Sequence, residues 1–105
     1  MATGNTPVLE ALVEINAVSM SRTELDARSL LLVRLAALAA VDAPVPSYLL
    51  HIGPAMDAGL TVEDAEDVLV AVAPIVGTPR TVAAAAKISE ALDVAIEVAL
   101  DESEE

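Results

Sequence analysis

Apolar residues recur at the three- and four-residue spacing of an α-helix in five segments of this chain. The segments cover approximately residues 7–18, 26–41, 46–59, 61–77 and 79–100. Between them lie short links that are polar or contain proline, such as residues 19–25 and 42–45. No run of alternating apolar and polar residues is long enough to indicate a strand. The pattern therefore predicts an all-α protein, a compact bundle of five helices.

Helix starts are indicated by side chains that accept hydrogen bonds from the first backbone amides. Thr6 and Thr78 each directly precede a proline, which is the arrangement of a cap followed by a proline at the first helical position. Thr61 and Asp64 have the spacing of a capping box, with Asp in place of the usual Glu or Gln. These signals predict the starts of the first, fourth and fifth helices.

Prolines and glycines predict where helices end. Gly59 suits a left-handed residue after the third helix, and we expect Pro74 followed by Gly77 to end the fourth. Pro54 lies inside the third segment and cannot donate a hydrogen bond to the carbonyl of Leu50. We therefore expect a kink or a break just after His51.

The second and fifth segments have different surroundings. The second is apolar over most of its circumference, apart from Arg28 and Arg34, and its alanine-rich half allows close approach, so we expect it in the middle of the bundle. The fifth has one apolar and one acidic face. From Glu90 onward there are seven acidic residues and no basic one, so we expect the end of this helix to fray and residues 101–105 to form an acidic tail.

The composition limits how such a bundle is built. The chain has 105 residues, enough for one domain, which we predict over residues 1–100. Apolar residues make up 55% of the chain, but Phe and Trp are absent and Tyr48 is its single aromatic residue, so Ala, Val, Leu, Ile and Met must build the core. So large an apolar fraction in so small a domain predicts a homo-oligomer.

Charge and cysteine content argue against several classes of function. Five basic and 17 acidic residues give a net charge of −12, which argues against nucleic acid and anionic membranes as partners. The absence of cysteine removes disulfides, thiol catalysis and thiolate metal sites. Uncharged stretches are shorter than the roughly 18 residues of a membrane span, and the first five residues lack the pattern of a secretory signal. We therefore expect a cytoplasmic protein.

His51 is the candidate for proton transfer, because its side chain type has an ordinary pKa near neutrality. A histidine between Leu50 and Ile52 more often serves packing or an interface. Ser47 lies one helical turn earlier and can face the same way, but no strand-turn-helix elbow accompanies the pair. No second histidine and no cysteine is present, so we predict no metal site and no cofactor.

Arg28 and Arg34 are candidates for binding an anion. A guanidinium buried in an apolar helix needs a carboxylate partner, which comes either from the protein or from an anionic ligand. Arg80 is a further candidate. Pairing within the protein is the simpler explanation, and the sequence leaves both open.

The order of these elements resembles the carboxymuconolactone decarboxylase family. The matching features are LDARSLLLVRLAALAAV, the YLLH that precedes an A-x-x-x-G-L-T turn, TVEDAEDVLVAVAPIVGTP, and TVAAAAKISEAL. They extend over residues 25–92, about two thirds of the chain. The resemblance implies the alkylhydroperoxidase D-like fold, a helical bundle that associates into trimers or hexamers.

The resemblance also implies which chemistry to expect. The peroxidase branch of the family carries C-x-x-C-x-x-x-H, and this chain has Pro44 and Ser47 at the cysteine positions before His51, so thiol peroxidase activity is not expected. The decarboxylase branch needs no cysteine. It needs cations that hold carboxylates and an acid that protonates carbon. By resemblance, His51 transfers the proton. Arg28 is the candidate that holds the carboxylate, and Arg34 and Arg80 are the alternatives.

Two functions therefore stay open. The first is a lyase that acts on a small unsaturated lactone or carboxylic acid in an apolar pocket at a subunit boundary, with His51 as general acid or base. The residues assigned to its substrate site are Arg28, Arg34, Tyr48 and Ser47. The second is a non-catalytic oligomeric binding or assembly protein that keeps the fold and uses its acidic tail to bind a basic partner.

Overall fold

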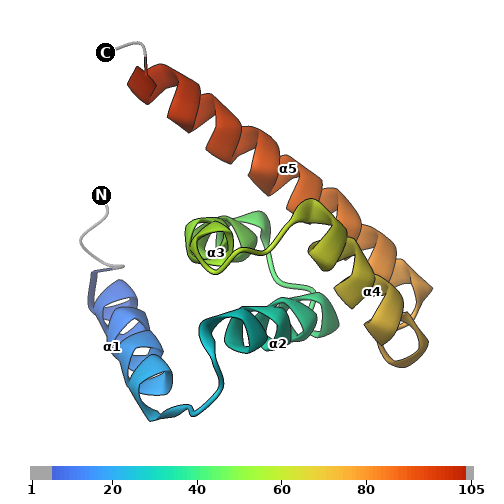
Figure 1. Ribbon diagram of the computed structural model, residues 1–105, viewed down its shortest axis with the longest axis horizontal. Coiled ribbons are helices and arrows are strands. Elements are labelled where there is room, and N and C mark those ends of the chain that lie inside the picture. Colours follow the sequence, from blue (N-terminus) through green and yellow to red (C-terminus); the bar gives the residue numbers. More distant parts are fainter. Residues whose placement is uncertain (1–5, 104–105) are drawn as a thin grey trace.

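A computed structural model describes residues 6–103 of the chain, and this part consists of five helices and their connections (Figure 1). The helices are α1 (Thr6–Arg22), α2 (Ala27–Ala40), α3 (Val45–Asp57), α4 (Val62–Val76) and α5 (Thr78–Ser103). The all-α class and the order of five helices are confirmed. Within residues 6–103, none of the helices combines the length and the apolarity needed to cross a membrane.

The core lies where α2, α3, α4 and α5 meet. The long helix α5 packs against the other three, and α2 also packs against α3 and α4. Ala39 and Ala91 are completely buried and Ala84 is 2% exposed, which lets the helix backbones approach closely. Tyr48 fills the space between them together with Leu69. Ala39 from the alanine-rich half of α2 therefore lies in this core, whereas Ala37 in the same half is exposed.

Three capping features are present, and the sequence analysis predicted the last two of them. The Asp26 carboxylate accepts a 2.7 Å hydrogen bond from the backbone N–H of Ser29 at the start of α2. Thr61 and Asp64 form both bonds of a capping box, with distances of 2.9 and 3.1 Å. Gly59 follows α3 with a φ of 84°, in the left-handed region that favours glycine.

Two prolines lie inside helices that the sequence analysis expected them to break or end. α3 continues without a break to Asp57, so the break predicted after His51 is wrong. Pro54 stands near the C-terminal end of this helix, where its missing N–H leaves only the carbonyl of Leu50 without its usual partner. Pro74 likewise belongs to α4, which ends two residues later at Val76 and is followed by Gly77, the predicted end.

Two helices are longer than predicted. α1 continues through four residues that were assigned to a link and ends at Arg22. α5 begins at Thr78 itself and extends past the predicted end at Leu100 to Ser103. Ala, Leu and Glu in this segment have high helix propensity, which outweighs the unfavourable acidic end. The last two residues of the predicted acidic tail, 104 and 105, lie outside the described residues.

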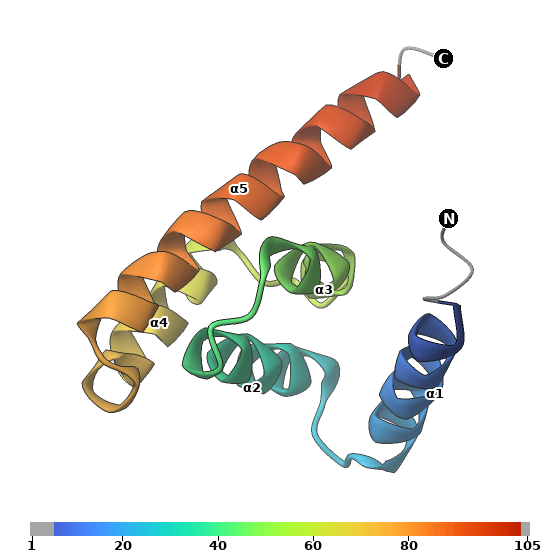
Figure 2. The same ribbon diagram turned by 180° about the vertical axis from the view of Figure 1, so that it is seen from behind.

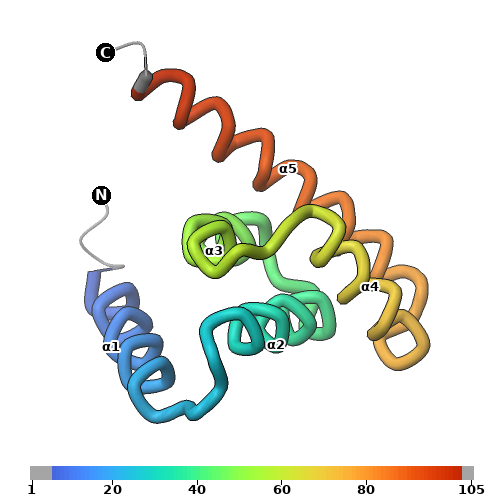
Figure 3. The backbone as a smooth tube through the Cα atoms, in the orientation of Figure 1, coloured from blue at the N-terminus to red at the C-terminus, as the bar shows by residue number. Residues whose placement is uncertain are grey.

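α1 stands apart from the other four helices (Figures 2 and 3). None of its Cα atoms lies within 8 Å of a Cα atom in another helix, and none of its residues is buried. Arg34 of α2 connects the two helices, because its guanidinium donates hydrogen bonds to Asn16 Oδ1 and, at 3.0 Å, to Ser19 Oγ of α1. Its large apolar side chains are 49–68% exposed: Val8, Leu9, Leu12, Val13, Ile15, Val18 and Met20. α1 therefore presents an apolar surface that no other part of residues 6–103 covers.

Candidate functional site

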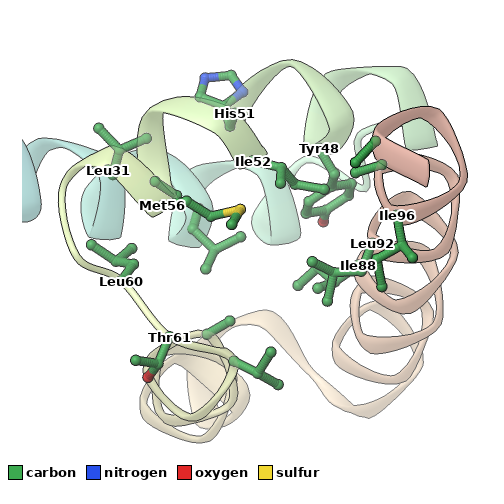
Figure 4. A pocket seen from close by; sticks show the side chains of 16 residues that line it. Leu31, Tyr48, His51, Ile52, Met56, Leu60, Thr61, Ile88, Leu92 and Ile96 are labelled. Atoms are coloured by element: carbon green, nitrogen blue, oxygen red, sulfur yellow. The ribbon is translucent and has the colours of Figure 1, made fainter. Parts of the chain in front are cut away.

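A cavity of about 460 Å³ opens between α2, α3, α4 and α5 (Figure 4). This volume lies within the range of small-molecule sites in proteins. The lining is almost entirely apolar, and none of its residues is Lys, Arg, Asp or Glu. The polar side chains in it are those of Tyr48, His51 and Thr61.

The apolar face of α5 forms one wall of this cavity. Ile88, Leu92, Ala95, Ile96 and Ala99 follow the i, i+3, i+4 spacing of a helix face and all lie in the lining. The C-terminal half of α5 extends beyond the packed body, and its predicted apolar face borders the cavity (Figure 1).

Tyr48 belongs both to the core and to the lining of the cavity. It is 3% exposed, and its hydroxyl group is buried without a hydrogen-bond partner among the described residues. In Figure 4 the ring extends from α3 on the side of Ile88, and the hydroxyl points into the space bordered by α4 and α5. Burial, followed by the negative charge of Asp42, raises the pKa of the phenol, so it is protonated at neutral pH.

His51 lies at the edge of the cavity. Its ring points away from the side chains of Tyr48 and Ile52 in Figure 4. Its Nδ1 atom is 2.7 Å from the backbone carbonyl oxygen of Ser47. Because a carbonyl oxygen only accepts, Nδ1 carries the hydrogen and Nε2 is the proton acceptor of the neutral ring. The backbone of Ser47 therefore sets the tautomer of His51.

Arg28 lies outside the lining and joins two helices. Its guanidinium donates hydrogen bonds to the carboxylate of Asp64 at 2.8 Å and to the carbonyl of Gly59 at 3.3 Å. The hydrogen bond from Arg28 and, next, the one from the backbone of Thr61 lower the pKa of Asp64. Because Leu60 and Thr61 belong to the lining, Arg28 braces one edge of the cavity.

Three other cations also have partners outside the cavity. Arg34 contacts α1, as described above, and Arg80 donates a 2.7 Å hydrogen bond to the carbonyl of Ala40 at the end of α2. Lys87 forms a 2.8 Å ion pair with Asp42, which lowers the pKa of that carboxyl group. The structure therefore does not bring Arg28, Arg34 or Arg80 together with His51 in the cavity.

Sequence analysis named two of the lining residues and expected an apolar pocket at a subunit boundary, whereas this cavity lies between helices of one chain. His51 and Tyr48 lie in the lining, whereas Ser47, Arg28 and Arg34 do not. One sequence signal could have indicated the cavity. The small residues Ala95 and Ala99 continue the apolar face of α5 toward its acidic end. In the part of the chain from 6 to 103, no group of three or more His, Cys, Asp or Glu side chains is arranged to hold a metal ion.

Comparison with known families agrees with this architecture. The model of the carboxymuconolactone decarboxylase family matches residues 6–91. The chain therefore belongs to this family, and the match includes α1, which the resemblance over residues 25–92 did not cover. No curated protein and no solved structure matches the chain.

Proposed function

We propose that this member of the carboxymuconolactone decarboxylase family is an oligomeric binding protein. It holds a small, mainly apolar molecule in the cavity between α2, α3, α4 and α5. The observation that carries this proposal is a cavity of about 460 Å³ with no Lys, Arg, Asp or Glu in its lining. Each Å² of apolar ligand surface that leaves water for such a site contributes about 25 cal/mol of favourable free energy. A carboxylate would lose its hydration there without meeting a cation.

The lyase hypothesis has His51 as its support. The Nε2 atom of this residue can accept a proton at the edge of the cavity. The cations that decarboxylation needs are engaged elsewhere, Arg28 by Asp64 at 2.8 Å and Arg34 by Ser19 at 3.0 Å. We therefore favour binding over decarboxylation. The chain has no cysteine, so we also propose that it lacks the thiol peroxidase chemistry of its family.

We propose further that copies of the chain associate through α1. An isolated helix of 17 residues is marginally stable in water, and α1 packs against no other helix of its own chain. Its seven large apolar side chains form a surface of the kind that a second copy covers in an oligomer. Trimers or hexamers, as the family resemblance implies, would bury this surface. The cytoplasmic location stays a prediction from the sequence.

A pair of tryptophan variants tests the binding function. Ala95 lies in the lining and Ala86 lies on the exposed side of the same helix. Ala95→Trp fills the cavity, whereas Ala86→Trp adds the same side chain outside it. The chain has no tryptophan, so each variant carries a single tryptophan, whose emission reports on its own surroundings.

The measurement is a calorimetric titration of each protein with butylbenzene. We expect the wild type and Ala86→Trp to bind it equally, and Ala95→Trp to bind it at least about tenfold more weakly. The tryptophan emission of Ala95→Trp should lie at shorter wavelength than that of Ala86→Trp. A wild-type protein that does not bind butylbenzene, or equal binding by both variants, contradicts the proposed function.

A further inference from the structure

We propose that the hydroxyl group of Tyr48 selects the ligand by donating a hydrogen bond to a neutral oxygen, such as the carbonyl of a ketone or an ester, in a molecule held in the cavity. This inference rests on the proposed function, because it requires that the cavity bind a ligand. It adds the chemical class of that ligand, which is a neutral and mainly apolar carbonyl compound.

The hydroxyl group of Tyr48 is buried and lacks a hydrogen-bond partner among the described residues. Tyr48 is 97% buried, and its oxygen has no hydrogen-bond partner among the described residues. Buried polar groups nearly always have a partner, because an unmade hydrogen bond inside a protein lowers stability. Phenylalanine would fill the same place without this unfavourable effect. A ligand oxygen would supply the missing partner.

The lining of the cavity around Tyr48 contains no charged side chain of Lys, Arg, Asp or Glu. A carboxylate ligand needs a cation, and the lining contains no Lys or Arg. Asp42 also acts on the phenol with its negative charge, and Lys87 forms an ion pair with this carboxylate. The same charge and the burial of Tyr48 keep the phenol protonated, so it is able to donate. Tyr48 therefore favours a neutral acceptor over an anionic one.

Tyr48 is much more deeply buried than other residues of the lining. Met56 and Ile96 are 68% and 57% exposed, so they border the mouth, whereas Tyr48 lies at the inner end. The hydroxyl points into the space that α4 and α5 border (Figure 4). A ligand would enter with its carbonyl group first and leave its apolar part against Ile52 and Leu92. The hydroxyl oxygen has almost no accessible surface, so a ligand would reach it only after a small shift of neighbouring side chains.

The experiment compares three probes of similar shape on the wild type and on Tyr48→Phe. The probes are 4-phenylbutan-2-one, which is a neutral ketone, butylbenzene, which has no oxygen, and 4-phenylbutanoate, which is an anion. We expect Tyr48→Phe to bind the ketone about tenfold more weakly than the wild type and to bind butylbenzene within about twofold of it. The anion should bind the wild type more weakly than the ketone does.

The thermal unfolding of Tyr48→Phe without a ligand is the second readout. We expect its melting temperature to equal or exceed that of the wild type, because the variant removes a hydroxyl that has no partner. A clear decrease would reveal a partner inside the protein and overturn the inference.

The outcomes separate the inference from the proposed function. Equal ketone affinity in both proteins, together with butylbenzene binding, overturns the role of Tyr48 and leaves the binding function standing. Tighter binding of 4-phenylbutanoate than of the ketone also overturns it, because the site would then prefer anions. If none of the three probes binds the wild type, the binding function fails and the inference fails with it.

Discussion

The guanidinium of Arg28 and the carboxylate of Asp64 form a 2.8 Å ion pair that joins the first turn of α2 to the first turn of α4. The same carboxylate accepts the backbone N–H of Thr61, so it serves both the helix cap and the contact between helices. The segment before α4 contributes Leu60 and Thr61 to the lining of the cavity. The ion pair therefore stabilises both the bundle and one wall of the candidate site.

Removal of this carboxylate should change how stability depends on pH. The pKa of Asp64 is lowered in the folded protein, so its contribution is complete above the ordinary value of 3.8 and is lost as the pH falls through the folded value. We expect Asp64→Asn to lower the melting temperature at pH 7, and the difference from the wild type to shrink below pH 3.8. Thermal unfolding between pH 7 and pH 2 measures this difference.

A suitable control is Asp67→Asn, an exposed carboxylate on the same helix. It should lower the melting temperature at pH 7 by less than Asp64→Asn does. A gap between the wild type and Asp64→Asn that stays constant down to pH 2 would contradict a stabilising role of the ionised carboxylate.

The two kinds of proline position in this fold should respond differently to substitution. Pro54 lies inside α3 and cannot donate to the carbonyl of Leu50, whereas Pro79 lies in the first turn of α5, where an N–H has no helical acceptor. We expect Pro54→Ala to raise the free energy of unfolding by roughly 1–2 kcal/mol. Pro79→Ala should give no gain. Denaturant titration of both variants tests this, and an equal effect of the two substitutions would disprove it.

The apolar surface of α1 predicts that single charges will dissociate the oligomer. Val13 is 68% exposed in one chain, and a carboxylate at this position would be buried if a second copy covers α1. We expect Val13→Asp to shift the protein to monomers in sedimentation velocity experiments at concentrations where the wild type is associated. Glu14→Gln, at the next position, should leave the association unchanged. A wild type that is monomeric at high concentration rules out association through α1.

Substitution of His51 distinguishes the binding function from the lyase function. The lining offers no cation to hold a carboxylate, so we expect no release of CO₂ from an unsaturated lactone acid by the wild type above the rate of His51→Ala. Butylbenzene should bind both proteins equally, because the His51 ring points away from the side chains of Tyr48 and Ile52. Turnover by the wild type that disappears in His51→Ala would establish the lyase in place of the binding protein.

Local signals predicted most of the fold, because caps and apolar spacing depend on residues close together in the chain. The capping box of Thr61 and Asp64 is an example, and the structure contains both of its bonds. The partner of Arg28 could not be predicted in this way. The sequence indicates that a guanidinium in an apolar helix needs a carboxylate, but only the packing of α2 against α4 brings Asp64, 36 positions away, within 2.8 Å.

The same limit explains what the sequence could not reveal about α1 and the cavity. An apolar helix face must be covered, but the spacing of its residues does not specify which chain covers it. The face of α5 from Ile88 to Ala99 has the same pattern whether it meets another helix or borders a space. Only the lengths and directions of the neighbouring helices decide between these two outcomes.

Isoleucine methyl signals offer the most direct test that the cavity is a binding site. The chain has five isoleucines, of which Ile52, Ile88 and Ile96 line the cavity while Ile15 and Ile75 lie elsewhere. In a titration of protein labelled with ¹³C at its isoleucine δ1 methyl groups, 4-phenylbutan-2-one should shift the signals of Ile52, Ile88 and Ile96. The signals of Ile15 and Ile75 should stay in place. A titration that moves none of the five signals, or only those of Ile15 and Ile75, would contradict a ligand in this cavity.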